Sequence, residues 1–185
     1  DTRHHLFLGV LMNLYGQYGV GLEELTKASE LSPGKQSILM EIGNTYVASG
    51  RYEEAMPFYK KAFDLETGFE DARISYAIGA IYTKNQKLLE ELLIPAYGTI
   101  AYPNDRLMRA YVETKQFALL VQIWQDQVKQ NPNDARARSM LASAYFQVGR
   151  MSEALSELIK ARDLETDPET KKQLETAIAE LRAGR

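Results

Sequence analysis

Residues 42–55 read IGNTYVASGRYEEA, and residues 141–154 read LASAYFQVGRMSEA. In both stretches a small residue is followed three positions later by tyrosine, as in Gly43 and Tyr46. A Gly-Arg pair then opens a second run, in which alanine recurs after seven positions, as in Ala55 and Ala62. Spacings of three and seven residues keep side chains on one helical face, so each stretch predicts two helices joined by a turn.

This pair of helices recurs along the chain with a period near 34 residues. Gly9 and Gly43 are 34 residues apart, and Gly43 and Gly79 are 36 apart. The longer interval predicts a two-residue insertion within residues 68–71. Periods of this size are typical of stacked helical hairpins, because one hairpin alone cannot bury its apolar face.

The quoted stretches resemble the tetratricopeptide repeat, with small and aromatic residues on a first helix and alanines on a second. The resemblance implies an all-α fold, a right-handed superhelical solenoid of about five helix-turn-helix hairpins in a single domain, residues 1–185. We expect the repeats at residues 2–35, 36–69, 72–103, 104–134 and 135–168. A capping helix is expected at residues 168–183, since Asp167 suits an N-cap and Pro168 a first helical position.

Close packing within the hairpins requires small side chains at the helix contacts. We expect these contacts at Gly9, Gly43, Gly79 and Ala142. Large aromatic side chains should fill the remaining space, and the candidates are Tyr46, Tyr82, Tyr111 and Tyr145.

The pattern is irregular in the middle of the chain. Pro95 falls well inside a predicted helix that begins near Gln86, and Gly98 stands where other repeats carry alanine; both weaken a helix. The next first helix, at residues 104–114, is predicted to be short. Two interpretations stay open here: neutral drift in a tolerant array, or a functional hinge marked by Pro95 and Gly98.

Composition argues against several classes of function. The chain has no Cys and a formal net charge of −3, so it offers neither thiolate chemistry nor the basic footprint of a nucleic-acid binder. His4 and His5 are its only histidines, and no nucleophile-base-acid set can be assembled around them. We therefore expect no enzyme activity, catalytic residue, cofactor or metal. No apolar run approaches the length of a membrane span.

The resemblance implies that the first helices line a concave groove for a peptide. The predicted groove residues are Asn13, Met40, Asn44, Arg73, Tyr76, Lys84, Arg109, Arg136 and Phe146. Four of them are basic and lie toward the C-terminal half, which suits an anionic partner such as a peptide carboxylate, an acidic motif or a phosphorylated group. The alternative interpretation is a solvated helical face with no ligand.

The preferred hypothesis is a noncatalytic scaffold that binds a protein or peptide. One alternative is the C-terminal part of a bacterial membrane protein, because residues 102–107 and 180–185 resemble the tails of O-antigen polymerase or ligase-like proteins. Another is a self-assembling array of repeats. The chain begins at Asp1, so we expect a longer parent protein. The sequence leaves the compartment open: it is cytoplasmic by default, and extracytoplasmic or membrane-tethered if the chain is a fragment.

Overall fold

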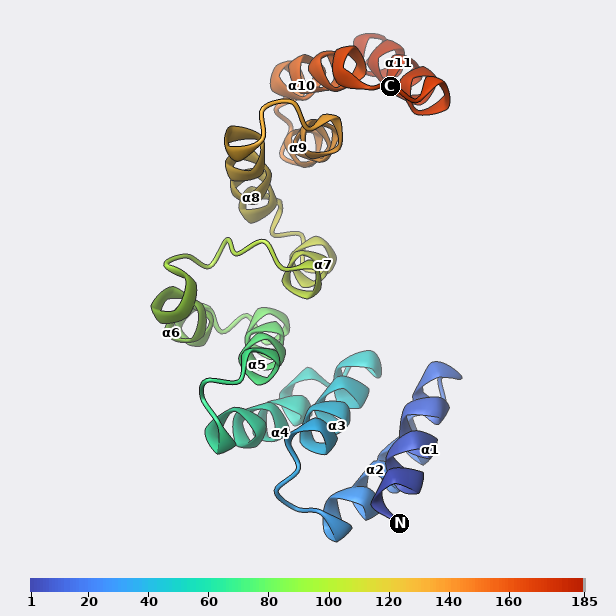
Figure 1. The fold of residues 1–185 in the computed structure, drawn as a ribbon, viewed down its shortest axis with the longest axis vertical. Coiled ribbons are helices and arrows are strands. Elements are labelled where there is room, and N and C mark those ends of the chain that lie inside the picture. Colours follow the sequence, from blue (N-terminus) through green and yellow to red (C-terminus); the bar gives the residue numbers. More distant parts are fainter. Residues whose placement is uncertain (185) are drawn as a thin grey trace. The chain divides into compact units, whose positions relative to one another are not determined.

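A computed structural model describes residues 1–184, which are helical apart from short connections (Figure 1). No strand occurs among these residues. The helices are α1 (Thr2–Leu14), α2 (Tyr18–Leu31), α3 (Gln36–Ala48), α4 (Tyr52–Leu65), α5 (Glu70–Tyr82), α6 (Gln86–Tyr97), α7 (Asp105–Glu113), α8 (Phe117–Gln130), α9 (Ala135–Gln147), α10 (Met151–Leu164) and α11 (Pro168–Arg182). The all-α repeat architecture expected from the sequence is confirmed.

Successive helices pack in pairs as five hairpins, α1–α2 through α9–α10, and α11 packs on α10. Each hairpin turn contains one residue in the left-handed backbone region. These residues are Gly16, Gly50, Lys84, Lys115 and Gly149, with φ between 55° and 76°. Their shared conformation identifies one equivalent position in all five repeats.

The first helices α1, α3 and α5 begin at residues 2, 36 and 70, so they repeat every 34 residues without interruption. The insertion expected within residues 68–71 is wrong, because α5 begins at Glu70 and not at residue 72. The 36-residue interval between two glycines has a different cause. Gly43 faces Tyr59 of its own hairpin, whereas Gly79 faces Tyr59 from the following hairpin. The two glycines are therefore not equivalent repeat positions.

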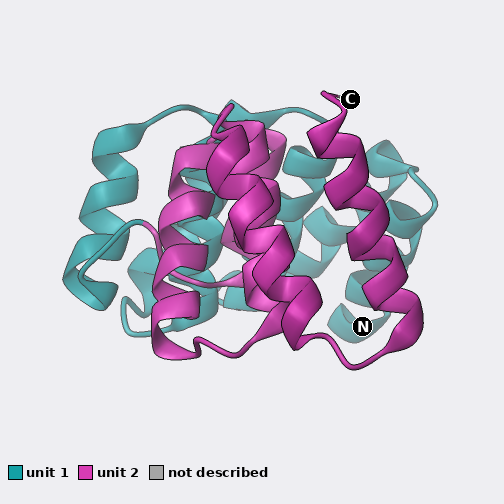
Figure 2. Cartoon of the chain, turned by 90° about the horizontal axis from the view of Figure 1, so that it is seen from above, with its two compact units in different colours: residues 1–100 teal, residues 101–185 magenta. Residues whose placement is uncertain are grey.

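The chain divides into two compact units, Asp1–Ile100 and Ala101–Arg185 (Figure 2). Unit 1 contains α1 to α6, and unit 2 contains α7 to α11. Each has its own buried core: Leu25 and Ile38 are 0% exposed in unit 1, as are Leu107 and Tyr111 in unit 2. The single-domain organisation expected from the sequence stays a prediction.

The irregular middle segment ends one helix early and shortens another. Gly98 does not lie inside α6, as the sequence suggested, but forms its C-cap with φ 74°. Pro95 lies near the end of that helix. α7 has only 9 residues, whereas α1, α3, α5 and α9 have 13 each, so the predicted shortening is confirmed. The hinge itself stays a prediction.

The C-terminal helix α11 begins as the sequence predicts. The side chain of Asp167 accepts a hydrogen bond from the Thr170 amide at 2.8 Å, and Pro168 takes the first helical position. Leu174 and Ile178 are buried against α10, while the opposite face of α11 is polar. This polar outer face is the usual ending of a stacked array.

Candidate functional site

Two predicted groove residues of unit 1 are held by hydrogen bonds inside the scaffold. Asn13 Nδ2 on α1 donates to Thr45 Oγ1 on α3 at 2.5 Å. Asn44 Oδ1 on α3 accepts from the Tyr59 hydroxyl on α4 at 2.9 Å. These two hydrogen bonds join neighbouring helices, so Asn13 Nδ2 and Asn44 Oδ1 are already engaged in the absence of a ligand. Asn13 Oδ1 is buried without a hydrogen-bond partner among the described residues.

Arg73 and Tyr76 on α5 face second helices and not the first-helix side predicted for them. Arg73 Cζ lies 6.0 Å from the centre of the Phe63 ring on α4 and 5.9 Å from that of Tyr97 on α6. Tyr76 is buried with its ring 6.0 Å from that of Phe63, and burial raises the pKa of its hydroxyl. The expected repeat began two residues too late, and two residues correspond to about 200° around an α-helix. This error of register explains the opposite orientation.

Met40 and Lys84 complete the predicted set in unit 1. Met40 lies where α3 meets α5, with its sulfur 3.8 Å from Ser75 Oγ, which fits a first-helix position. Lys84 is exposed, but it occupies the turn between α5 and α6 and not a helix face. Unit 1 therefore does not gather its predicted groove residues on one surface.

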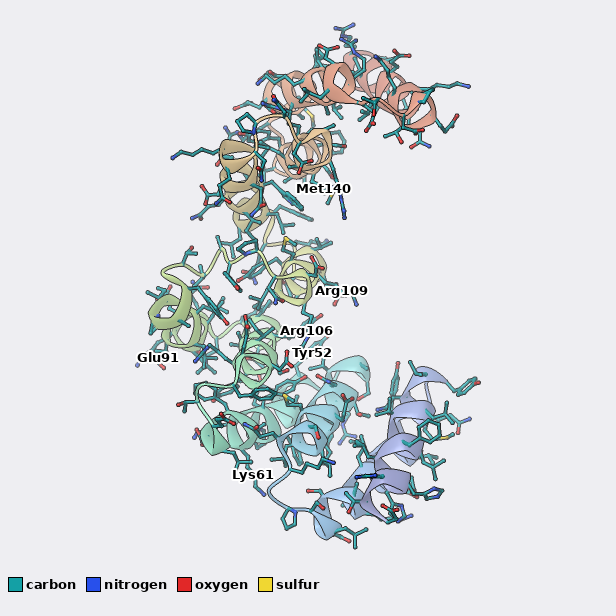
Figure 3. The ribbon with its side chains drawn as sticks, in the orientation of Figure 1. Tyr52, Lys61, Glu91, Arg106, Arg109 and Met140 are labelled. Carbon is teal, nitrogen blue, oxygen red and sulfur yellow. The ribbon has the colours of Figure 1, made fainter. Side chains whose placement is uncertain are left out.

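Unit 2 contains an apolar hollow lined by residues of α7, α8 and α9. Its volume is about 230 Å³. We call it the α7–α9 hollow, and its lining residues are Met108, Arg109, Val112, Phe117, Leu120, Trp124, Met140, Ser143, Ala144 and Gln147. Arg109 from α7 and Met140 from α9 are labelled in Figure 3. Arg109 is thus the one predicted groove residue that lines this hollow.

A second hollow, of about 270 Å³, lies between α9 and α11 over α10, and we call it the α9–α11 hollow. Phe146, which is 43% exposed, contributes to its lining together with Leu158 and Leu181. Ser143 lines both hollows, so they flank α9 and share an edge. Arg136 is exposed in the first turn of α9, one turn before Met140.

The α7–α9 hollow exists because two first helices of unit 2 do not meet. In unit 1, Asn13 contacts Thr45 across α1 and α3, and Met40 contacts Ser75 across α3 and α5. In unit 2, no described Cα atom of α7 comes within 8 Å of one of α9. The shortened α7 leaves an opening whose floor is the α8 side chains Leu120 and Trp124.

The charges around these hollows fall into two groups. Arg138 of α9 is committed to the scaffold: its Nη1 lies 2.6 Å from Glu157 Oε2 of α10, and its Nε donates to the Pro132 carbonyl at 2.8 Å. No carboxylate of the described residues pairs in this way with Arg109 or Arg136, and both are exposed. These two guanidinium groups are therefore available to an anion.

The apolar part of this surface was not predicted from the sequence. Val112 and Met140 are 49% and 41% exposed at the hollow, and Trp124 lies in its lining. Apolar residues at helical spacing are normally assigned to the core. These residues are uncovered only because α7 and α9 do not touch. The short α7 was the single signal of this in the sequence.

Other kinds of site find little support among residues 1–184. No group of three or more His, Cys, Asp or Glu residues there could hold a metal ion. His5 Nδ1 lies 2.7 Å from Glu24 Oε2 and so links α1 to α2. None of the described helices has both the length and the apolar character that crossing a membrane requires.

Two segments match family models of the tetratricopeptide repeat, residues 36–67 and residues 122–168. A curated relative, the TPR repeat-containing protein YpiA of Bacillus subtilis, is 25% identical over 144 residues. The match covers 75% of this chain but only 34% of that relative, so the chain spans about a third of its length. Together with the helical architecture, these matches show that the chain contains tetratricopeptide repeats.

Solved structures with the same fold share little sequence with the chain. A tetratricopeptide-repeat protein from Parabacteroides merdae has a TM-score of 0.65 at 16% identity, covering 98% of this chain and 72% of its own. MamA gives a TM-score of 0.59 at 19% identity, covering 89% and 91%. YrrB, described as having an unusual peptide-binding site, gives 0.55 at 18% identity, covering 95% and 92%. At these identities the likeness shows the fold, a helical-repeat scaffold.

Proposed function

We propose that the chain is a noncatalytic scaffold whose unit 2 binds an acidic peptide on the face formed by α7 and α9. The observation that carries the proposal is the pair Arg109 and Arg136, which are exposed and have no carboxylate partner among residues 1–184. Arg109 lines an apolar hollow, and Arg136 lies one turn before Met140 of the same hollow. Guanidinium groups bind carboxylates and phosphates through two parallel hydrogen bonds. A peptide-binding site in the similarly folded YrrB agrees with this type of function.

The net charge of −3 makes the local basic character informative. An acidic peptide is repelled by the chain as a whole, so it should be attracted only where positive groups lack internal partners. Binding should therefore weaken as salt concentration rises, because dissolved ions screen the attraction between exposed charges, with a Debye length of about 10 Å at 0.1 M. This dependence on salt concentration distinguishes electrostatic binding from purely hydrophobic binding.

The test uses Trp124, the only tryptophan of the chain, as a fluorescent reporter in the lining of the hollow. A library of acidic peptides is titrated against the wild-type chain and the variants Arg109→Ala and Arg136→Ala. Lys129→Ala, which removes an exposed cation from the last turn of α8, serves as the matched control. The proposal expects saturable binding that both arginine variants weaken and the control does not. Binding equal in all four proteins, or no binding at all, would contradict it.

Self-association is a second candidate function, supported by an uncovered face of α1. Phe7, Val10, Leu11 and Leu14 form a helical stripe, and Phe7 and Leu14 are 65% and 80% exposed. The opposite side of α1 already packs on α2. Residues 6–22 carry no charge, so pairing two copies of this stripe would bring no like charges together.

Sedimentation equilibrium from micromolar to near-millimolar concentration tests self-association. The expected result is an apparent mass that rises above 21.0 kDa and returns to that value in Phe7→Glu. Leu31→Glu, at an exposed apolar position on the end of α2, is the control. A constant monomer mass would refute this candidate and leave the peptide-binding proposal untouched.

A further inference from the structure

We propose that the α7–α9 hollow receives one large apolar side chain, preferably aromatic, from a peptide whose neighbouring acidic residues bind Arg109. This inference rests on the proposed peptide-binding function and names the chemical class of its ligand. The anchor residue, and not the acidic charge alone, would then determine which peptides bind.

The lining of the hollow is suited to an apolar group. Seven of its ten lining side chains are apolar, and the polar ones are Arg109, Ser143 and Gln147. Val112 and Met140 are about half exposed there, so an occupant would remove apolar surface from water that the chain leaves uncovered. Buried apolar anchors surrounded by polar contacts are the usual source of affinity at peptide and protein interfaces.

The size of the hollow points to a single side chain. Its volume of about 230 Å³ lies below the roughly 300–1,000 Å³ typical of pockets for whole small molecules. An apolar cavity of about 150 Å³ in another protein accommodates benzene. One phenyl or isobutyl group therefore fits, whereas a folded or polycyclic ligand does not.

The chemistry of the walls favours an aromatic ring. Met108 lines the hollow from α7 and Met140 from α9, and Phe117 and Trp124 line it from α8. Methionine sulfur makes favourable contacts with aromatic rings and adapts its shape to them. Aromatic rings in turn prefer edge or offset contact with other rings.

Arg109 gives the hollow its charge preference. It is the only charged residue in the lining, and none of the described carboxylates pairs with it. A carboxylate next to the anchor would reach Arg109 while the anchor ring occupies the hollow. The recognised element is therefore an apolar residue flanked by Asp or Glu.

Four pentapeptides separate the two contributions. They are acetylated, amidated and flanked by one glycine on each side, with the central sequences Asp-Phe-Asp, Asp-Ala-Asp, Asn-Phe-Asn and Asn-Ala-Asn. Binding is followed by Trp124 fluorescence and by ¹³C-methyl NMR of the methionines. Wild-type chain should bind Asp-Phe-Asp at least about tenfold more tightly than Asp-Ala-Asp, since small apolar differences in a pocket give 10- to 200-fold discrimination. The methyl signals of Met108 and Met140 should shift only with the phenylalanine peptides.

The variant Met140→Glu places a charge in the wall of the hollow, and Met151→Glu is its control, at an exposed methionine outside it. The preference for phenylalanine should fall to about threefold or less in Met140→Glu and persist in Met151→Glu. Equal binding of Asp-Phe-Asp and Asp-Ala-Asp to the wild type would overturn the anchor inference while leaving acidic-peptide binding intact. A ring preference without an effect of Asp would support the anchor and refute the charge preference. Failure of all four peptides would overturn both.

Discussion

Tyr59 on α4 packs directly against Gly43 on α3, so closely that a Cβ atom at residue 43 would lie 2.5 Å from Tyr59 Cε1. The same ring meets Gly79 on α5, where a Cβ atom would lie 3.0 Å from Cδ2. Tyr59 is 1% exposed and donates its hydroxyl hydrogen to Asn44 at 2.9 Å. One aromatic ring therefore fills the seam between two hairpins, and the two glycines make room for it.

Enlarging residue 43 should displace this ring. We expect Gly43→Leu to lower the free energy of unfolding by about 1–3 kcal/mol, because overpacking forces side chains out of their preferred rotamers. Urea denaturation followed by circular dichroism measures the change. Gly68→Ala is the control, since nothing lies within 4 Å of a Cβ atom there. Equal stability of the two variants would mean that the seam tolerates the added volume.

Removing one partner of the ion pair between Arg138 and Glu157 should destabilise unit 2 strongly. Their side chains are only 14% and 11% exposed, and Lys160 Nζ lies 2.6 Å from Glu157 Oε1. Glu157→Ala would leave Arg138 buried without its partner, which typically costs about 3–5 kcal/mol. Glu153→Ala breaks an exposed pair with Arg150 and should cost far less, because exposed ion pairs contribute little to stability. Denaturation curves measure the free energy of unfolding of both variants. An equal loss in the two variants would refute the prediction.

Two turn positions carry lysine in a conformation that favours glycine. Lys84 and Lys115 have φ of 55° and 59°, whereas the equivalent residues of the other three hairpins are glycine. The left-handed conformation costs a non-glycine residue roughly 1–2 kcal/mol. Lys84→Gly and Lys115→Gly should therefore raise the melting temperature, and the reverse change Gly50→Lys should lower it. A lower melting temperature in both glycine variants would show that the lysine side chains contribute more than the strain costs.

The α1–α2 hairpin should lose stability in acid. Hydrogen bonds from Lys27 and His5 lower the pKa of Glu24 from 4.5 to about 2. A carboxylate with a lowered pKa stabilises the folded state fully above its unfolded pKa, and this contribution is lost as pH falls from about 4.5 toward 2. Wild type should thus exceed Glu24→Gln in stability at pH 6, and the difference should shrink between pH 4.5 and 2. A difference that does not change with pH would contradict this assignment.

Local sequence signals were enough to predict the repeat. The small and aromatic residues around Gly43 and Tyr46, and the glycines at the turns, specify hairpins because helix periodicity and turn conformation depend on neighbouring residues. The cap at Asp167 and the short helix before Thr114 were predictable for the same reason. The position of the third repeat was not predictable. The spacing of Gly43 and Gly79 suggested that they are equivalent residues of two repeats, but they face the same ring from neighbouring hairpins.

The sequence by itself determined the class of fold, the number of hairpins, and the presence of arginines at residues 109 and 136. Only the tertiary structure decided which faces meet: Arg73 and Tyr76 turn toward second helices, Asn13 and Asn44 are used in internal hydrogen bonds, and Val112 and Met140 line an open hollow. The reason is geometric. A helix rotates by about 100° per residue, so a two-residue error in register reverses its face. Whether two helices touch depends on side chains from separate hairpins, which no local pattern contains.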